Sequence, residues 1–565
     1  MFGRRTKKIR EIAPDEIFLD ASNLPGHDTR QFEGRVERPV SRRAVAGVGA
    51  VFVLIALVFS GRAFSLEVVQ GSSYALISQN NTLDRSILFA TRGVIYDRTG
   101  QELAWNVPQP DATSTVDTYA LRQYTSAPGF SLLLGFISYP QQDKSGIWWR
   151  EEYTGVSGVE SSYNPSLNGV NGSQMIETDA HGRVQRTDLI SPPQPGKNLT
   201  LAIDADMQAA LYHALVSGAK VDGFEGGAGI IMDVRTGELL SLTSFPEYDH
   251  QAFQNGDAAA VSAAAHSPYA PMLDRAIGGL YTPGSIVKPM YAAGALDSGI
   301  ISPDKEIIST GKLVVPNPYD PAHPSIFNDW TVHGPIDMKT AIAVSSDEYF
   351  YTIGGGFGDQ KGLGIAGLDK YAKLFGLDTP TGIDLAGEQT GIIPSPEWKQ
   401  KVFGADGQWY LGDTYHTAIG QFGFQITPIE AVRYVAAIAN GGKLLTPQLL
   451  ASSTPQFAQL SVPDSDLAIV RAGMRLAVTS TRKDATVKEF NIPGIDLAAK
   501  TGTAQLGSHN QWVNSWVIGF WPADNPKYAF AVVLEKGPAY ETFNAASSMV
   551  SFFNWLVANH PEYAK

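Results

Sequence analysis

The sequence predicts an α/β (α+β) protein whose main domain is an antiparallel sheet flanked by helices. A β-rich pedestal and a single transmembrane helix are expected to precede this domain. Strand-like runs at 495–500, 513–520 and 528–534 gather near the C-terminus between helical segments, which is typical of such a layered fold. Residues 66–200 are rich in β-forming and turn residues, and residues 44–60 are uncharged and apolar. At 565 residues the chain is long enough for two or three domains.

The apolar run near the N-terminus predicts a membrane anchor. Ala44–Ser60 spans 17 residues, at the short end of what crosses a bilayer. Arg42 and Arg43 precede it, so the positive-inside rule places the N-terminus in the cytoplasm. A cleaved signal peptide is the alternative, but no Ala-x-Ala site follows and the basic leader is long. We therefore expect a cytoplasmic tail (1–43), an uncleaved anchor (44–61) in the cytoplasmic (inner) membrane and the bulk of the chain outside the cytoplasm.

Charge and composition exclude several classes of function. Residues 1–43 hold ten Lys/Arg and seven Asp/Glu, whereas the whole chain has a net charge of −13. An acidic body argues against nucleic acid as a partner. The absence of cysteine excludes disulfides, thiolate metal sites and a cysteine nucleophile. Asp320, His323, Asp329 and His333 lie close in sequence, but we predict neither a metal site nor a cofactor.

The segment after the anchor is predicted to be a β-rich, non-catalytic pedestal. Residues 92–104 predict a strand, an Asp-Arg-Thr-Gly turn and a second strand. The glycines of residues 155–169 lack the Lys-Ser/Thr and the strand–helix frame of a phosphate-binding loop. The run Pro192–Lys197 marks a linker. We therefore expect a pedestal over 62–200 and a second domain over 201–565.

The second domain mixes helices and strands. Apolar residues at helical spacing from Asp206 to Ser217, with Asp204 or Asp206 as the cap, predict a helix. Thr427 and Glu430 form a capping box that opens a helix ending at Gly441. The remaining predicted elements are a hairpin of Gly227–Val234 and Leu239–Phe245, and a final helix from Phe543 to Ala558.

The stretch Tyr281–Pro289 (YTPGSIVKP) contains a candidate nucleophile. Pro283 and Gly284 indicate a turn, after which Ser285 can start a helix that carries Lys288 one turn further on. Residues three apart share a helix face, so the serine hydroxyl and the lysine amine can meet. A serine needs an adjacent base, and a lysine that is neutral in a desolvated, cation-lined pocket can serve.

The Ser-x-x-Lys spacing alone is a weak signal. It also occurs at Ser217–Lys220, Ser302–Lys305, Ser309–Lys312 and Ser480–Lys483, where we interpret it as a solvated surface pair. Two further motifs follow downstream in the right order, and they favour Ser285 as the nucleophile.

Those motifs are Ser345-Ser346-Asp347, near the C-terminal part of a helix beginning about Asp337, and Lys500-Thr501-Gly502-Thr503 at the end of a strand. Acyl transfer from an amide needs a nucleophile, a proton carrier, an oxyanion site and a grip on the substrate carboxylate. Ser345 can relay a proton to the leaving amine, with Lys500 providing the electrostatics. The strand edge after Gly502 can pair with an extended substrate, and the Thr501 and Thr503 hydroxyls can bind its carboxylate. The backbone N–H groups of Ser285 and Thr503 are the expected oxyanion hole.

These motifs are those of the penicillin-recognising serine acyltransferases. The chain resembles the class B penicillin-binding proteins, most closely their elongation-type branch, from the anchor to about Gly537. Further matching segments are Arg92–Ala104, Gly155–Gly169, Pro195–Asp204, Leu273–Ala276, Trp409–Thr414 and Ile419–Gln421. Asp347 stands where most relatives have Asn but where this branch commonly has Asp, and the resemblance makes it a substrate-binding residue.

The resemblance implies a peptidoglycan D,D-transpeptidase for cell-wall elongation. Ser285 would attack the D-Ala–D-Ala bond of a stem peptide, expel the last D-Ala and pass the acyl group to an amine on a neighbouring strand. β-Lactams would acylate the same serine. The implied partners are a SEDS-type glycosyltransferase in the membrane and other proteins of the elongation complex.

Two alternatives remain open at this stage. One is an acyl hydrolase on the same chemistry, a D,D-carboxypeptidase or a β-lactamase; the other is a non-catalytic activator of a glycosyltransferase. A Ser-His-Asp hydrolase is not supported, because no Gly-x-Ser-x-Gly elbow occurs. The chain also departs from the family pattern. The pedestal segment 105–154 is short, which puts contacts with scaffold proteins in doubt, and Phe422 stands where Gly is usual, which is expected to reshape a loop near the site.

Overall fold

The computed structural model describes residues 41–80, 83–109, 118–178, 184–317, 320–539 and 544–565. These residues divide into two compact units. The first contains Met1–Asp84 and Glu177–Arg186, and the second contains Arg85–Ile176 and Thr187–Lys565. Most of the expected cytoplasmic tail lies outside the described residues.

A long apolar helix dominates the first unit. Helix α1 (Arg42–Phe64) is capped by the Ser41 side chain, which accepts a hydrogen bond from the Ala44 amide, and none of its residues is buried. A π-helical turn, η3 (Ser65–Val69), and α2 (Gly71–Asn80) follow. Among the described residues, Arg42–Val69 is the single helical stretch long and apolar enough to cross a membrane. The helix extends beyond the predicted anchor at both ends.

Short strands and helices make up the segment that the sequence predicts to be a pedestal. The predicted strand–turn–strand is present as β2 (Ile95–Tyr96) and β3 (Glu102–Val107), whose turn is closed by the Asp97 carboxylate accepting from the Thr99 and Gln101 amides. Its sheet has the order β11-β2-β3-β4, and β1, β9 and β10 form a second sheet in the order β1-β9-β10. The remaining bounds are β1 (Leu83–Leu88), β4 (Leu121–Tyr124), α3 (Ser131–Leu134), β5 (Ile137–Ser138), β6 (Gln141–Gln142), β7 (Trp148–Arg150), β8 (Thr154–Gly155), α4 (Gly158–Ser162), α5 (Asn164–Leu167), β9 (Gly172–Thr178), β10 (Val184–Ser191) and β11 (Leu199–Thr200).

An antiparallel five-stranded sheet in the order β13-β12-β22-β21-β20 forms the centre of the C-terminal domain. Successive residues of a strand point to opposite faces, so each strand supplies two cores. Ala531 and Val533 belong to one core, whereas Phe530 and Val532 belong to the other. The strands are β12 (Gly226–Asp233), β13 (Leu239–Phe245), β20 (Ala498–Leu506), β21 (Trp512–Trp521) and β22 (Tyr528–Pro538).

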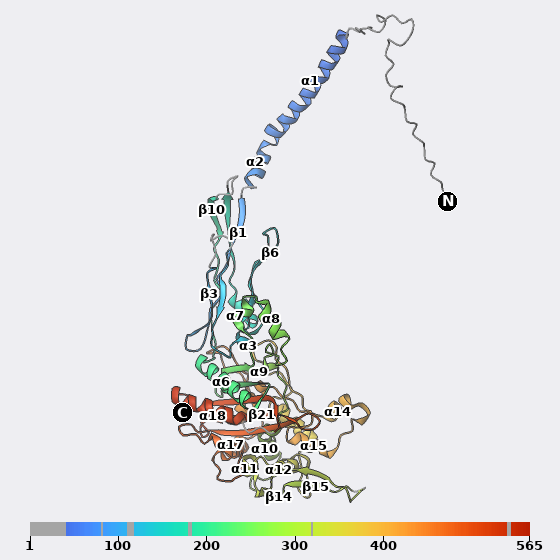
Figure 1. The fold of residues 1–565 in the computed structure, drawn as a ribbon, viewed down its shortest axis with the longest axis vertical. Coiled ribbons are helices and arrows are strands. Elements are labelled where there is room, and N and C mark those ends of the chain that lie inside the picture. The colour runs from blue at the N-terminus through green and yellow to red at the C-terminus, as the bar shows by residue number, and fades with distance from the viewer. Residues whose placement is uncertain (1–40, 81–82, 110–117, 179–183, 318–319, 540–543) are drawn as a thin grey trace, which may run out of the picture. The chain divides into compact units, whose positions relative to one another are not determined.

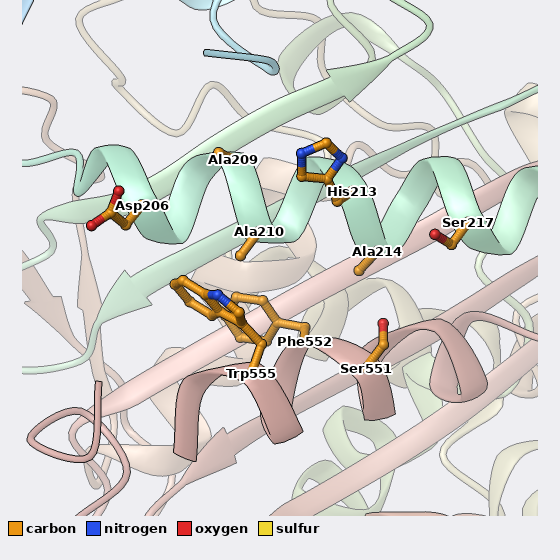
Figure 2. Close-up of a pocket in the computed structure, with 9 residues that line it drawn as sticks. All are labelled: Asp206, Ala209, Ala210, His213, Ala214, Ser217, Ser551, Phe552 and Trp555. Atoms are coloured by element: carbon orange, nitrogen blue, oxygen red, sulfur yellow. The ribbon is translucent and has the colours of Figure 1, made fainter. Parts of the chain in front are cut away.

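Helices cover both faces of this sheet (Figure 1). On one face α6 (Ala205–Asp222) packs beside α18 (Ala545–Asn559), and Figure 2 shows Phe552 and Trp555 of α18 pointing toward α6 across a hollow of about 420 Å³. On the other face α16 (Pro428–Ala439) lies in the core with α10 (Lys288–Asp297). The predicted hairpin, the Asp204 cap and the Thr427–Glu430 capping box are all present.

Shorter elements complete the domain. They are α7 (His250–Gln254), α8 (Ala258–Ala265), α9 (Arg275–Gly278), η4 (Gly284–Val287), β14 (Ile307–Ser309), β15 (Lys312–Val315), β16 (Ser325–Asn328), β17 (Gly334–Ile336), α11 (Met338–Ala343), α12 (Asp347–Gly355), α13 (Gly364–Leu374), α14 (Pro396–Phe403), η5 (Gly404–Asp406), α15 (Leu411–Ala418), β18 (Lys443–Leu445), β19 (Phe457–Gln459), α17 (Asp464–Thr479) and η6 (Lys488–Phe490).

Two local predictions are wrong. The Lys-Thr-Gly-Thr motif does not end a strand: β20 continues to Leu506, because its pairing with β21 extends to Trp512. The Ser-Ser-Asp motif is not in the C-terminal part of a helix. Helix α11 ends at Ala343, Ser345 has a left-handed φ of 56°, and Ser346 caps the new helix α12. A left-handed residue interrupts a right-handed helix, so the motif connects two helices.

Candidate active site

The candidate nucleophile lies on a tight turn that leads directly into a helix. Ser285 is in the 3-10 turn η4, and Lys288 is the first residue of α10. In a 3-10 turn residues three apart are eclipsed, so the two side chains share a face. Ser285 is half-buried and Lys288 is 0% exposed. Within the described residues the Ser285 hydroxyl has no hydrogen-bond partner, which leaves it available to a ligand.

Three neighbouring elements hold this turn in place. The Gly284 amide donates to the Gly420 carbonyl (3.0 Å). The buried Tyr434 hydroxyl of α16 donates to the Ile286 carbonyl, and the Trp516 indole of β21 donates to the Thr282 carbonyl (3.0 Å). The position of Ser285 is therefore fixed by backbone contacts on both sides of it.

Ser345 lies between the two candidate lysines. Lys288 Nζ donates to the Ser345 carbonyl (2.6 Å) and lies 3.3 Å from Ser345 Oγ, and Lys500 Nζ donates to Ser345 Oγ (2.7 Å). Lys288 Nζ is also 2.6 Å from Asp347 Oδ1, in an ion pair whose lysine is fully buried. The second motif thus contacts both lysines, and Ser345 is suited to pass a proton between groups on either side.

Strand alternation directs Lys500 into the site. Ala498 and Ala499 point into opposite cores, so Lys500 shares the face of Ala498, toward η4 and α10. Burial lowers the pKa of the Lys500 amine well below its ordinary 10.5, and the nearby Lys288 charge lowers it further, whereas Asp347 acts in the opposite direction. A neutral amine beside a serine hydroxyl can accept a proton.

The third motif borders the nucleophile turn along a sheet edge. In the described chain β20 pairs with β21 alone, which leaves its other edge open for an extended ligand. Thr501 is half-buried and Thr503 is exposed. A Cβ on Gly502 would lie 2.8 Å from the Pro283 carbonyl oxygen, and one on Gly284 would lie 3.0 Å from that of Thr503. Glycine at both positions lets the turn and the strand approach closely.

All the residues predicted for the site therefore lie on three segments that contact one another. The nucleophile turn is packed against β20, and Lys288 and Lys500 both reach Ser345. The hollow between α6 and α18 contains none of these residues (Figure 2). It faces the opposite core of the sheet, so we assign it no part in the chemistry.

Phe422 has a left-handed backbone conformation, which favours glycine. Its φ is 62°, in the left-handed region, where a side chain costs roughly 1–2 kcal/mol. The ring lies 5.8 Å from those of both Trp398 and Trp409, and the Lys399 ammonium lies 5.2 Å from its centre. These contacts offset the strain. Whether Phe422 reshapes this loop relative to other members of the family stays a prediction.

Sequence reasoning missed the residues that hold the Ser-Ser-Asp motif in place. Asp329 and His333 were noted for their closeness in sequence and assigned no role, yet Asp329 accepts a hydrogen bond from Ser346 Oγ (2.6 Å) and His333 contacts Asp484. His323 pairs separately with Asp320 at the surface. Among the described residues no group of three His, Asp or Glu side chains is arranged to hold a metal. The spacing of Asp329 and His333 was a signal of an ionic network, but its partner Asp484 is 151 positions away.

The comparison with protein families identifies the fold and the family. The model described as penicillin binding protein transpeptidase domain matches residues 227–554, and that described as penicillin-binding protein dimerisation domain matches residues 113–201. The chain is a class B penicillin-binding protein. The transpeptidase match covers all three motifs.

Several relatives place this penicillin-binding protein in the elongation-type branch. It is 28% identical over 606 residues to the peptidoglycan D,D-transpeptidase MrdA of Salmonella typhimurium, a match covering 89% of this chain and 93% of the relative. It is 31% identical to MrdA of Escherichia coli K12 over 412 residues, covering 68% and 62% of the two chains.

Solved structures agree with this placement. PBP2 of Pseudomonas aeruginosa, solved in complex with WCK 5153, is 28% identical with a TM-score of 0.67, over 85% of this chain and all of that one. PBP2 of Helicobacter pylori, solved in complex with MreC, is 25% identical with a TM-score of 0.68, over 85% of this chain and 99% of that one.

Proposed function

We propose that this class B penicillin-binding protein is a peptidoglycan D,D-transpeptidase of cell-wall elongation that works through an acyl-enzyme on Ser285. The observation that carries the proposal is the convergence of the three motifs on Ser345, whose hydroxyl lies 3.3 Å from Lys288 Nζ and 2.7 Å from Lys500 Nζ. The MrdA relatives are named for the same activity.

The proposed reaction has two steps. Ser285 Oγ loses its proton to the lysine–serine network and attacks the carbonyl of the penultimate D-Ala. The peptide bond breaks, the leaving nitrogen takes up a proton through Ser345, and the last D-Ala departs as an amine. An amine of a neighbouring stem peptide then attacks the ester and forms the cross-link, the bond from the acyl carbon to Ser285 Oγ breaks, and the amine proton returns to Ser285 Oγ through the lysine–serine network. The backbone N–H groups of Ser285 and Thr503 stabilise the oxyanion of each step.

Binding of the substrate is assigned to the open edge of β20. Thr501 and Thr503 bind the terminal carboxylate, and Gly502 leaves room for the substrate backbone. Asp347 contacts the peptide after its ion pair with Lys288 breaks. A β-lactam enters the same site and acylates Ser285.

Labelling with a fluorescent penicillin tests the nucleophile. The detergent-solubilised parent is expected to be labelled, and Ser285→Ala to lose the label while its unfolding midpoint is unchanged. Ser217→Ala is the matched control, because it removes the serine of a surface Ser-x-x-Lys pair on α6. Mass spectrometry should find the penicilloyl group on the peptide containing Ser285. A label that survives Ser285→Ala moves the nucleophile elsewhere.

The rate at which the label is lost distinguishes the two alternatives. A transpeptidase keeps the penicilloyl group for many minutes, a β-lactamase releases it within its turnover time, and a non-catalytic activator is never labelled. Formation of cross-linked dimer from stem-peptide substrates then separates transpeptidation from D,D-carboxypeptidase activity.

We further propose that the protein crosses the inner membrane once, with its N-terminus in the cytoplasm and its catalytic domain outside. The apolar stretch Arg42–Val69 and the basic residues before it support this orientation. Its proposed partners are a SEDS-type glycosyltransferase in the membrane and an MreC-like protein, since PBP2 of Helicobacter pylori is solved with MreC. Protease treatment of intact spheroplasts is expected to digest the catalytic domain and to leave an N-terminal tag intact.

A further inference from the structure

A line of polar side chains connects the Ser-Ser-Asp motif to a buried histidine. Asp329 Oδ2 accepts from Ser346 Oγ (2.6 Å) and from the Glu348 amide (3.0 Å), so it holds both ends of the first turn of α12. Ser345 and Asp347, which contact Lys288, flank Ser346 directly. A shift of the Asp329 carboxylate would therefore move the residues that contact the catalytic lysine.

His333 lies behind Asp329, between two carboxylates. Its Nδ1 donates to Asp484 Oδ2 (2.8 Å), and its Nε2 lies 3.6 Å from Asp329 Oδ1. The distance between His333 Nε2 and Asp329 Oδ1 is too long for a hydrogen bond, but it allows an ionic interaction that burial strengthens. The imidazole and the Asp329 side chain are both 0% exposed.

The charges around His333 come from three segments. Asp329 is on its own loop, and Asp484 and Arg482 are on the loop after α17. Arg482 forms two hydrogen bonds with Asp484 (3.0 and 2.8 Å) and a third with the His333 carbonyl (3.0 Å). Lys288, on α10, acts on Asp329 from the side of the active site. A neutral imidazole would leave Asp329 without its second cation.

We propose that His333, as an imidazolium, is a positioning residue for the acylation step. It draws Asp329 toward itself, Asp329 fixes Ser346 and the start of α12, and Ser345 is thereby held against Lys288 and Lys500. The inference rests on the proposed function of these three residues. It does not require His333 to touch the substrate.

The expected pH dependence follows from the two carboxylates. Burial opposes the charge on His333, but Asp329 and Asp484 outweigh it and raise the pKa of the imidazole above its ordinary 6.5. Burial would raise the pKa of the Asp329 carboxyl, but the contact with His333 and the hydrogen bonds from Ser346 Oγ and the Glu348 amide outweigh it and lower that pKa to about 2. A group with a raised folded pKa contributes fully below its ordinary value and ceases to contribute as the pH rises through the raised one. The positioning effect is therefore lost on the alkaline side.

The test compares second-order rates of acylation by a fluorescent penicillin for the full chain and for His333→Gln across the neutral and alkaline range. Glutamine keeps a donor for Asp484 but carries no charge. At the lowest pH of this range, we expect His333→Gln to be acylated more slowly than the parent by up to about a hundredfold. The acylation rate of the parent divided by that of the variant should fall toward one as the pH rises, because the His333 imidazolium of the parent then loses its proton. His323→Gln is the matched control, since it removes an exposed histidine paired with Asp320.

Each possible rate ratio supports or overturns the proposed role of His333. A rate ratio of one throughout overturns the proposal, and a ratio that differs from one but does not change with pH shows a purely structural role. If His333→Gln does not fold, Asp484→Asn replaces it. That variant keeps the imidazole and removes one carboxylate, so the alkaline loss of acylation should move to lower pH, and an unmoved profile overturns the proposal. Failure of the proposed function is distinct, because the parent itself would then remain unlabelled.

Discussion

Replacing Lys500 by Met removes one amine from the centre of the site while keeping the length of the side chain. Lys500 Nζ donates to Ser345 Oγ (2.7 Å) and to the Thr501 carbonyl (2.8 Å), and it has no carboxylate within salt-bridge distance in the described chain. Its lowered pKa favours the neutral amine, which can exchange a proton with Ser345. Positioned acid–base groups contribute about 10²–10⁴-fold to a rate. At about 1.36 kcal/mol per factor of ten, Lys500→Met should raise the acylation barrier by about 2.7–5.4 kcal/mol.

Acylation by a fluorescent penicillin measures this effect. The parent rate should decline as the pH falls, because protonation of Lys500 places a second buried ammonium beside Lys288. Lys500→Met should be slow and should lack this decline. Lys401→Met, an exposed lysine of α14, is the control. A variant that acylates within about tenfold of the parent, with the same pH profile, would refute the assignment of Lys500 as a proton carrier.

Stability provides an independent check on the same residue. Between the lowered pKa of Lys500 and 10.5 the unfolded chain binds a proton that the folded chain does not. The free energy of unfolding of the parent should therefore rise with pH in this window. Lys500→Met should lack this contribution, so the difference in unfolding free energy between parent and variant must change with pH.

Two further predictions concern Glu160, which lies in a buried ion cluster, and Gly420, which contacts the nucleophile turn. Glu160 is fully buried with Arg92 and Arg122, so Glu160→Gln leaves two guanidinium groups without a counter-charge and should lower the free energy of unfolding by about 3–5 kcal/mol in a urea titration. The exposed Glu152→Gln should leave it unchanged, and a loss below about 1 kcal/mol would show that water compensates the charges. Gly420→Ala should lose penicillin labelling below its unfolding temperature, because φ is 75° and a Cβ would overlap the carbonyl oxygen of the nucleophile turn. Normal labelling would show that this turn tolerates displacement.

Local signals in the sequence were sufficient for many elements. The capping box at Thr427, the Asp204 cap and the hairpin around Thr236 depend on residues within a few positions of one another, and all three are present. The positions where helices and strands end could not be predicted from local signals in two cases. The continuation of β20 past Lys500 depends on pairing with β21, and the break at Ser345 depends on a backbone angle that no local pattern signals.

The sequence by itself determined which residues are predicted to carry acyl-transfer chemistry, because the three motifs are short and their chemistry belongs to their residue types. Only the tertiary structure decided how they meet. Lys288 and Lys500 contact Ser345 across 57 and 155 positions, and Asp484 reaches His333 across 151. Contacts at such separations depend on which strands pair and which face each side chain takes. Those are properties of the packed sheet and helices, and no stretch of the chain carries them alone.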